Sequence, residues 1–425
     1  MSGFPLIKNL NRKLFLLFGL IILGLSSCRD KCTETYKRIT TTPIFIAVSE
    51  VRNSFEVSGP MEIENAGKLY ATDNWLFVVE KQKGFHIIDN SNPSSPVNMH
   101  FIQLLGCSDV VVAGNYIYAN NGNDVVVIES VGSGQFKIVD RERDAIMLYQ
   151  ISGNQISIES EVTEEWVTEE EYNCEGVRSW GIGVQEDFVL ASGSNTDFGG
   201  SGTAGSTARM ILVNDHIYAV NQWQLLSFDI SNPSNISTPK ESELNSWLQN
   251  IETIYPMGNY LFIGSTTGMF IFDYASNPDY PQYVSSASHV RSCDPVVAQG
   301  DFAYVTTHGG TNCGGNTNVL AIYDIKNIKI PNLIKQYDMS YPLGLGIDNA
   351  TLFICEGDYG FKVFSAESPR DIDIQLISEY PEIKAYDVIA RKDVVIITSS
   401  DGVYQYSYKD PSNLKLLSKV YSINH

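Results

Sequence analysis

Seven positions that share one place in the chain are the first candidates for chemistry, because each lies just before an apolar, strand-like segment. The positions are Lys68, Asp109, Arg209, Glu252, Asp294, Gly344 and Asp387. The residues close to them in sequence that could add hydrogen bonds or stacking are His289, Arg291, Tyr341 and Tyr386. Mixed charges that converge on a concave site are what a binding pocket requires. The structural alternative is that Asp and Glu before a strand accept backbone N–H bonds within the turn.

The carboxylates of this set could also support hydrolysis. Two spaced carboxylates are sufficient for glycoside hydrolysis, and Glu252, Asp294 and Asp387 are the candidates for the acid and the base. The sequence holds no Gly-x-Ser-x-Gly, His-Glu-x-x-His or P-loop motif. Because the chain has 49 Asp and Glu residues, a pair of candidates is not diagnostic. A non-enzymatic binding or scaffold protein is the leading hypothesis, and a glycoside hydrolase or polysaccharide lyase is the alternative.

The elements that must position these residues repeat along the chain. The equivalent positions in successive units are Trp75, Tyr116, His216, Tyr260, Phe302, Thr351 and Val394. The steps between them are 41, 100, 44, 42, 49 and 43 residues. One step is anomalous, and the others indicate a structural repeat of about 42 residues.

Each unit has the same internal pattern. A first strand meets a two-residue turn such as Gly114-Asn115, which is a hairpin signal, and a second strand follows. A third, apolar strand ends in Asp, as at Asp89, and Ser-Asn-Pro often comes next, as at Ser91-Asn92-Pro93. A more polar fourth strand closes the unit.

Four antiparallel strands in each of several such units are the signature of a β-propeller. The prediction is therefore an all-β chain with a single ring of about seven four-stranded blades over residues 66–424, with six to eight blades compatible with the repeats. First strands line the central channel of such a ring. The seven positions named above should then surround one mouth of that channel.

The anomalous step leaves an insertion, residues 144–208, between the second and third units. It holds eight Glu between Glu159 and Glu175, followed by a Gly/Ser-rich stretch at residues 199–206. We expect a solvated acidic excursion and then a flexible segment. A degenerate eighth blade stays open, since Ile151–Ile158 and Asp187–Ala191 could be strands. The Glu run could collect calcium, but it lacks the ligand pattern of an EF-hand loop, so no cofactor is assigned.

The units resemble the LVIVD-repeat family. The resemblance rests on a strand that ends Ile87-Ile88-Asp89, followed by Ser91-Asn92-Pro93 and by Pro96-Val97, and it covers residues 66–143 and 209–424. Stretches such as His289–Val297 and Tyr341–Ile347 look closer still to lipoproteins of this family from Bacteroidetes. The resemblance implies a β-propeller of the cell envelope or the cell exterior, with no established biochemical activity.

The first residues look like a targeting signal. Basic residues precede the apolar run Leu14–Leu25, which is too short to span a bilayer but has the length of a signal-peptide core. The sequence Leu25-Ser26-Ser27-Cys28 resembles the bacterial lipobox, in which the Cys is acylated. We therefore expect a signal peptide at residues 1–27 and a lipid anchor at Cys28. Residues 28–65 would form a tether that helps to close the ring. The predicted location is the cell envelope, as an outer-membrane lipoprotein, with periplasmic or surface orientation left open.

Two cysteines in one repeat are the first candidates for a disulfide. Cys293 and Cys313 precede the first strand and follow the second strand of the same unit, and these places lie on one face of a blade. An oxidising compartment favours a disulfide between them. His289 and His308 would complete a zinc-binding set, but the compartment argues against free thiolates, and no metal is assigned.

Three further cysteines have weaker signals. A Cys107–Cys174 disulfide would join the acidic excursion to the second unit. Cys355 lies in the apolar run Leu352–Cys355 and is expected in the core.

The charge balance excludes one class of partner. The chain carries 29 basic and 49 acidic residues, a net charge of −20, and loss of residues 1–27 makes it −23. Such a surface repels phosphate backbones. We expect no nucleic acid, contact with a membrane through the lipid anchor alone, and a protein or glycan as ligand.

Overall fold

The computed structural model describes residues 31–132, 134–172, 202–244, 250–288, 295–309, 318–369 and 375–421. Nearly all of them lie in β strands or in turns, and the helix of this part of the chain, α2 (Val48–Arg52), has five residues. The chain divides into two compact units, residues 1–40 with 162–182 and residues 41–161 with 183–425. No helix among the described residues is long and apolar enough to cross a membrane.

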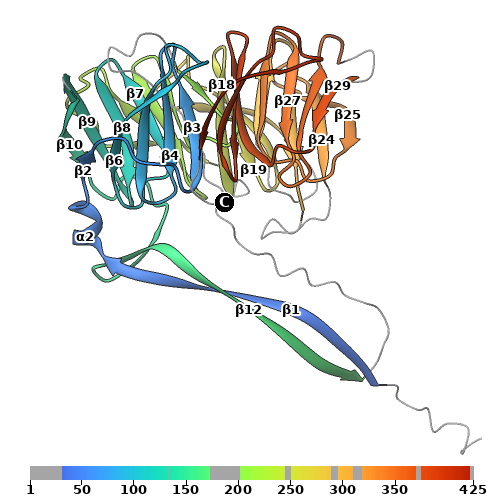
Figure 1. Ribbon diagram of the computed structural model, residues 1–425, viewed down its shortest axis with the longest axis horizontal. Helices are drawn as coiled ribbons and strands as arrows, with labels where there is room; N and C mark the ends of the chain where they lie inside the picture. Colours follow the sequence, from blue (N-terminus) through green and yellow to red (C-terminus); the bar gives the residue numbers. More distant parts are fainter. Residues whose placement is uncertain are drawn as a thin grey trace, which may run out of the picture. The chain divides into compact units, whose positions relative to one another are not determined.

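The second unit contains seven antiparallel sheets of four or more strands, counted over the described ranges (Figure 1). Blade 1 is built on β3 (Ala66–Ala71), β4 (Trp75–Glu80), β5 (Gly84–Asp89) and β6 (Val97–Gln103). Blade 2 consists of β7 (Val110–Ala113), β8 (Tyr116–Asn121), β9 (Asp124–Gly132) and β10 (Gln135–Glu142). Blade 3 consists of β14 (Met210–Val213), β15 (His216–Val220), β16 (Leu225–Asp229) and β17 (Lys240–Glu241).

The remaining four blades follow in chain order. Blade 4 consists of β18 (Ile251–Met257), β19 (Tyr260–Ser265), β20 (Gly268–Asp273) and β21 (Gln282–Ser288). Blade 5 consists of β22 (Val296–Gln299), β23 (Phe302–Thr307), β24 (Val319–Asp324) and β25 (Asn332–Asp338). Blade 6 consists of β26 (Leu345–Asp348), β27 (Thr351–Cys355), β28 (Phe361–Ser365) and β29 (Gln375–Tyr380). Blade 7 consists of β30 (Ala385–Arg391), β31 (Val394–Ser399), β32 (Gly402–Ser407) and β33 (Lys415–Tyr421).

Burial within each blade explains the repeated sequence pattern. Second and third strands such as β4 and β5 are buried along almost their whole length, because both faces of the sheet pack against neighbouring blades. Fourth strands such as β25 are largely exposed. The Asp that ends the third strand orders the next turn. The Ser91 N–H donates to Asp89 Oδ1 at 2.9 Å, and the Ser231 N–H donates to Asp229 Oδ1 at 2.8 Å.

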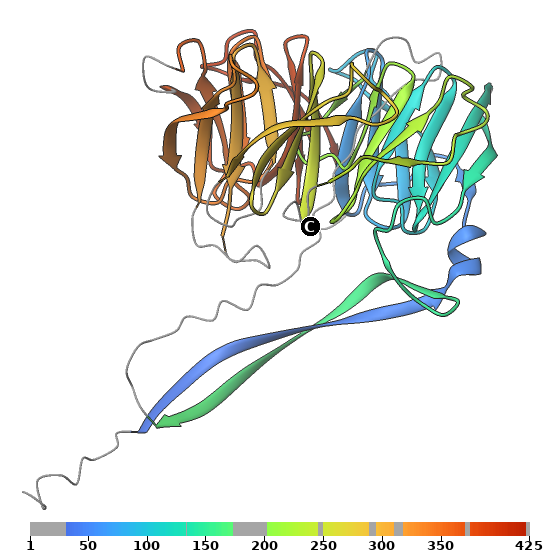
Figure 2. The ribbon, with the colours of Figure 1, turned by 180° about the vertical axis from the view of Figure 1, so that it is seen from behind.

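The blades follow one another around a ring (Figure 2). Their first strands are in contact in the order β7, β14, β18, β22, β26, β30 and β3. A hydrophobic cluster that includes Tyr70 and Val110 joins blade 1 to blade 2. Between blades 7 and 1, the side-chain amides of Asn90 and Gln405 hydrogen-bond to each other at 2.7 and 3.0 Å. The predicted all-β propeller is confirmed.

Two short strands extend blade 1. β2 (Glu56–Ser58) pairs with the outer strand β6, and β13 (Thr203–Ala204) pairs with the inner strand β3. The contact between blades 7 and 1 runs through β30 and β3. Within the 28–65 segment, β2 therefore lies at an outer edge, and Ile63 is buried in a hydrophobic cluster with residues of blades 1 and 7 such as Leu69 and Ile389.

The acidic excursion is partly a strand. β1 (Lys31–Ala47), β12 (Gln155–Tyr172) and β11 (Gln150–Ser152) form a three-stranded sheet in the order β1-β12-β11. The expectation of a solvated loop was wrong for residues 159–172, because pairing with a distant segment satisfies their backbone groups. This sheet is not an additional four-stranded blade. Residues 187–191, the other strand considered for one, lie outside the described residues.

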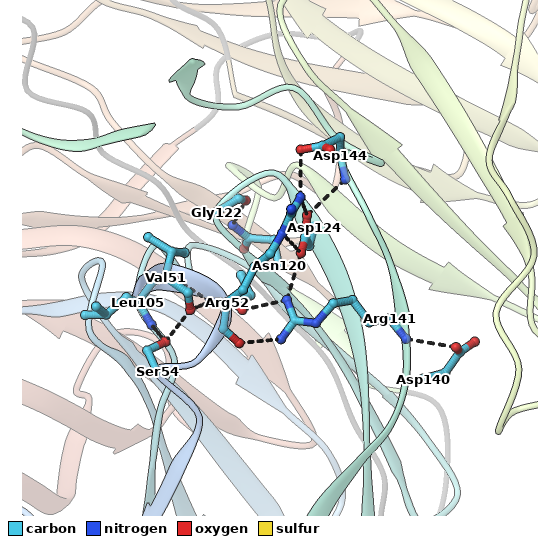
Figure 3. Close-up of polar contacts among 11 residues, drawn as sticks. Val51, Arg52, Ser54, Leu105, Asn120, Gly122, Asp124, Asp140, Arg141 and Asp144 are labelled. Atoms are coloured by element: carbon cyan, nitrogen blue, oxygen red, sulfur yellow. Dashed lines mark hydrogen bonds and ion pairs between the residues drawn. The ribbon is translucent and has the colours of Figure 1, made fainter. Parts of the chain in front are cut away.

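A charged network holds α2 against blade 2 (Figure 3). Arg52 Nε and Nη2 donate to the two carboxylate oxygens of Asp124, both at 2.8 Å. Arg141 Nη1 donates to Asp124 Oδ2 at 2.8 Å, and the Asp144 N–H donates to Oδ1 at 2.9 Å. Beside this network, Val51 packs with Ile156 and other apolar residues, including Ile158 of β12 and Leu105.

Candidate functional site

Three charged residues among the seven predicted positions lie together, with Arg209 and Gly344 beside them. Lys68, Asp109 and Asp387 come from blade 1, the loop before blade 2, and blade 7, and their exposed fractions are 0%, 2% and 0%. The Lys68 ammonium forms an ion pair with Asp109 Oδ2. It also interacts electrostatically with the Asp387 carboxylate. We call these three residues the channel cluster.

Local hydrogen bonds fix the two carboxylates in place. The N–H groups of Ser108 and Asp109 both donate to Asn120 Oδ1 at 2.8 Å, and Asn120 Nδ2 donates to the Gly106 carbonyl at 2.7 Å. The Asp387 N–H donates to Thr398 Oγ1 at 3.0 Å. In both blades a polar residue near the end of the second strand therefore orders the backbone at the start of the first.

Burial dominates the acid–base properties of the channel cluster. It raises the pKa of Asp387 to about 7, against smaller opposing effects of the Val388 N–H, Lys68 and Thr207. It also raises the pKa of Asp109, although Lys68 lowers it. Burial lowers the pKa of Lys68 to about 8 despite the attraction of Asp109. The environment thus disfavours the charged form of each of the three groups.

The chain itself covers this cluster. The segment Thr203–Ala208, which we call the plug, precedes β14 and contacts four blades. Its first two residues pair with β3 of blade 1, and the Ile254 N–H of blade 4 donates to the Ala208 carbonyl at 2.7 Å. The Leu345 N–H of blade 6 donates to Ser206 Oγ at 2.8 Å. In blade 7, Asp387 Oδ1 accepts a 3.5 Å hydrogen bond from Thr207 Oγ1.

Two glycines let the plug close over Asp387. A Cβ on Gly205 would lie 1.9 Å from Asp387 Oδ2, and a Cβ on Gly344 would lie 2.6 Å from Oδ1. Asp387 Oδ2 is buried and has no hydrogen-bond partner. Ser206 and Ala208 of the plug are both 0% exposed. The expectation of a flexible segment was therefore wrong for residues 203–206, because small residues pack closely here across the channel.

The other described positions lie around this cluster. Arg209 follows the plug, and its Nε donates to the Glu252 carbonyl at 3.3 Å. The Glu252 side chain is half-buried. Tyr341 is also half-buried and makes an edge contact with His308, with 5.2 Å between ring centroids. Burial lowers the pKa of His308 to about 4. The Tyr386 carbonyl accepts a 3.1 Å hydrogen bond from the Gly344 N–H.

Several predicted residues cannot be placed. Those that lie outside the described residues are Cys28, Cys174, His289, Arg291, Cys293, Asp294 and Cys313. Cys107 is a free thiol and completely buried, and Cys174, its suggested disulfide partner, lies outside the described residues. Cys355 is buried in a hydrophobic cluster, as expected. Over the described ranges, no group of three or more His, Cys, Asp or Glu is placed to hold a metal ion.

The sequence-based reasoning missed two features of this end of the ring. The plug has the composition of a linker, and its one usable signal was the run of Gly, Ala, Ser and Thr, which permits close backbone approach. Trp223 and Tyr359 also received no role, although they are 53% and 62% exposed. Both lie in turns between second and third strands, β15–β16 and β27–β28.

Comparison with known proteins supports the fold and the repeat. The LVIVD repeat model matches residues 65–102, 204–240 and 253–288, which correspond to blades 1, 3 and 4. No curated protein sequence matches the chain.

Solved structures share the fold at very low sequence identity. A putative 6-phosphogluconolactonase from Bacteroides uniformis is 10% identical with a TM-score of 0.51, and the match covers 84% of this chain and 95% of that one. The periplasmic gluconolactonase PpgL of Pseudomonas aeruginosa is also 10% identical, with a TM-score of 0.50 and coverage of 87% and 96%. At this identity the likeness shows the fold alone. The chain therefore contains LVIVD repeats at these three places and has a β-propeller fold.

Proposed function

We propose that this protein is a lipid-anchored β-propeller of the cell envelope that binds a protein or glycan partner and does not catalyse a reaction. The observation that carries the proposal is a contrast at one end of the ring. Two large aromatic side chains are exposed there, while the charged residues of the channel are enclosed by the chain.

The anchor is supported by the sequence before the propeller. A twelve-residue apolar run is followed by Leu25-Ser26-Ser27-Cys28, and acyl chains on Cys28 would hold the protein at a membrane. Labelling with a palmitate analogue tests this part of the proposal. We expect label on the wild-type protein and none on Cys28→Ala, which should leave the membrane fraction. Label retained on the variant would contradict the anchor.

The binding surface is supported by exposed aromatic residues. In an antiparallel blade, the turns between second and third strands lie at the same end as the connections between blades. Trp223 and Tyr359 therefore lie at the end of the ring that carries the plug. Rigid aromatic side chains contribute much of the binding energy of protein interfaces, and they also offer flat surfaces for stacking. We assign the contact surface to this end, and the sequence adds Arg291 and Asp294 to it.

The buried channel cluster argues against the hydrolase alternative. A glycosidase needs two carboxyl groups on either side of a bound sugar. Asp387, one of its three proposed carboxylates, is 0% exposed and contacts Gly205 of the plug. One structure of similar fold is named as a gluconolactonase, but this is an analogy of fold alone.

A binding and cleavage screen tests both functions. The double variant Trp223→Ala/Tyr359→Ala should lose most retention of partners from an envelope extract and most binding on an array of oligosaccharides. The control is Tyr280→Ala/Ile330→Ala, because these residues are 44% and 69% exposed in turns between third and fourth strands, at the opposite end. Equal binding by both variants would remove the surface assignment. Cleavage of any oligosaccharide by the wild type, lost in Asp387→Asn, would favour the hydrolase.

A further inference from the structure

The plug encloses the Asp387 carboxylate, which has few hydrogen-bond donors around it. Asp387 Oδ2 is buried, has no hydrogen-bond partner, and lies against the backbone of Gly205. Its other oxygen accepts the 3.5 Å hydrogen bond from Thr207, which is itself a plug residue. An ionised carboxylate in this position loses its water, and the Val388 N–H, Lys68 and the Thr207 hydroxyl offset this loss only in part.

Charged and titratable groups from the neighbouring blades 1 and 6 interact with Asp387. Lys68 of β3 is the cation that interacts with it, and the Cys355 thiol of β27 interacts with it from blade 6. Asp109 and Arg209 act on Lys68, and Glu356 acts on Cys355. Lys68 is already paired with Asp109. Asp387 therefore shares its nearest cation with a competing carboxylate.

We propose that Thr203–Ala208 is a reversible plug, which covers the channel mouth while Asp387 is protonated and is released when Asp387 ionises. This inference goes beyond the proposed function, because it concerns access to the channel whatever partner the protein binds. The two conformations are a covered state, in which Asp387 is enclosed, and an open state, in which Asp387 is hydrated. The proton acts as a ligand that binds the covered state with higher affinity.

The direction of the pH effect follows from the pKa of Asp387. A carboxyl group whose pKa is raised in the covered state stabilises that state at low pH, and this contribution is lost as pH rises from the ordinary Asp pKa of about 4 to about 7. Lys68 has the opposite effect, since a lysine with a lowered pKa favours the covered state as it loses its proton above about 8. Release is therefore expected to increase as pH rises from about 4 to about 7, and the range from about pH 5.5 upward covers the upper part of this change.

Hydrogen exchange of the full chain measures this release. The peptide that contains residues 203–208 should lose protection on the order of tenfold between about pH 5.5 and 7.5, after correction for intrinsic exchange. In Asp387→Asn the protection should be high at both pH values. Wild-type protection that does not change with pH, or an unchanged pH dependence in Asp387→Asn, would overturn the proposal.

A second variant opens the plug without changing a charge. Gly205→Ala places a Cβ against Asp387 Oδ2, so that residues 203–208 should exchange rapidly at both pH values. Gly59→Ala is the matched control, because nothing lies within 4 Å of a Cβ at that position. If Asp387→Asn does not fold, the wild-type pH series and Gly205→Ala decide the question. A protected plug in Gly205→Ala would also overturn the proposal.

Discussion

Two buried clusters of charge in this ring differ in how completely their carboxylates are satisfied. Asp124 accepts hydrogen bonds from Arg52, Arg141 and the Asp144 N–H, all between 2.8 and 2.9 Å (Figure 3). Burial alone would raise the pKa of Asp124, but these donors outweigh it and hold the pKa below its ordinary value.

Asp387 has the same side chain and a similarly low exposed fraction, but it lies deeper in the protein, and the outcome is the opposite. One of its oxygens has no partner, its cation is shared with Asp109, and its pKa is raised to about 7. The comparison teaches that burial of a carboxylate does not by itself identify a functional group. Depth of burial and the number of donors together decide whether the carboxylate stays ionised and structural or changes protonation near neutral pH.

The largest effect is expected from breaking the pair in the channel cluster. Lys68→Met leaves the Asp109 carboxylate buried without its cation, which should lower the free energy of unfolding by about 4 kcal/mol. The double variant Lys68→Met/Asp109→Leu removes both charges and should recover most of this loss. Urea unfolding of the single and double variants measures the difference. A double variant no more stable than Lys68→Met would show that the pair is not the source of the effect.

A slightly smaller loss of stability is expected when the cluster around Asp124 is disrupted. Asp124→Ala removes the acceptor of two arginines, which are 24% and 16% exposed and so keep partial access to water. We expect a loss of about 3 kcal/mol in urea unfolding. Asp144→Ala is the matched control, because that side chain is 51% exposed, and it should cost less than about 1 kcal/mol. Equal losses in the two variants would contradict the central place of Asp124.

The two clusters differ most clearly in the sign of the change in stability when the aspartate is replaced, and Asp387 is the position that tests this. The raised pKa means that ionised Asp387 destabilises the fold as pH rises from about 4 to about 7, so Asp387→Asn should stabilise the protein above this range. The gain should be on the order of 2 kcal/mol at pH 8 and near zero at pH 4, measured by thermal or urea unfolding at both pH values. Destabilisation at pH 8 would mean that Asp387 is satisfied as Asp124 is.

The smallest effect on stability is expected at the exposed aromatic residues. Trp223→Ala changes a side chain that is 53% exposed, so unfolding should change by less than about 0.5 kcal/mol. Partner retention should nevertheless fall, because the proposed role of Trp223 is contact. A large loss of stability together with the loss of binding would assign Trp223 a structural role instead.

Much of the blade architecture could be predicted because its causes are local. Asp89 and Asp229 end third strands and hold the following Ser N–H, so the pattern reports a turn that forms within a few residues. Apolar second and third strands follow from burial between blades. The convergence of Lys68, Asp109 and Asp387 also followed, because equivalent strands of a ring begin at the same end.

The plug and the Asp124 network could not be predicted in the same way. Gly205 and Asp387 are far apart in the chain, and composition favoured a linker for residues 199–206. Arg52 lies before the first repeat and reaches Asp124 and Arg141 of blade 2 through tertiary contacts. Neither contact leaves a periodic signal in the sequence, because each occurs once in the chain and is not repeated from blade to blade.

The sequence by itself therefore determined the repeating strands, their order and the end of the ring at which charged residues gather, since those depend on neighbours in the chain. Only the tertiary structure decided whether each charge is satisfied and whether the channel mouth is open. Those properties depend on which distant backbone and side-chain groups come within hydrogen-bonding distance, and on the space that a missing Cβ leaves at Gly205.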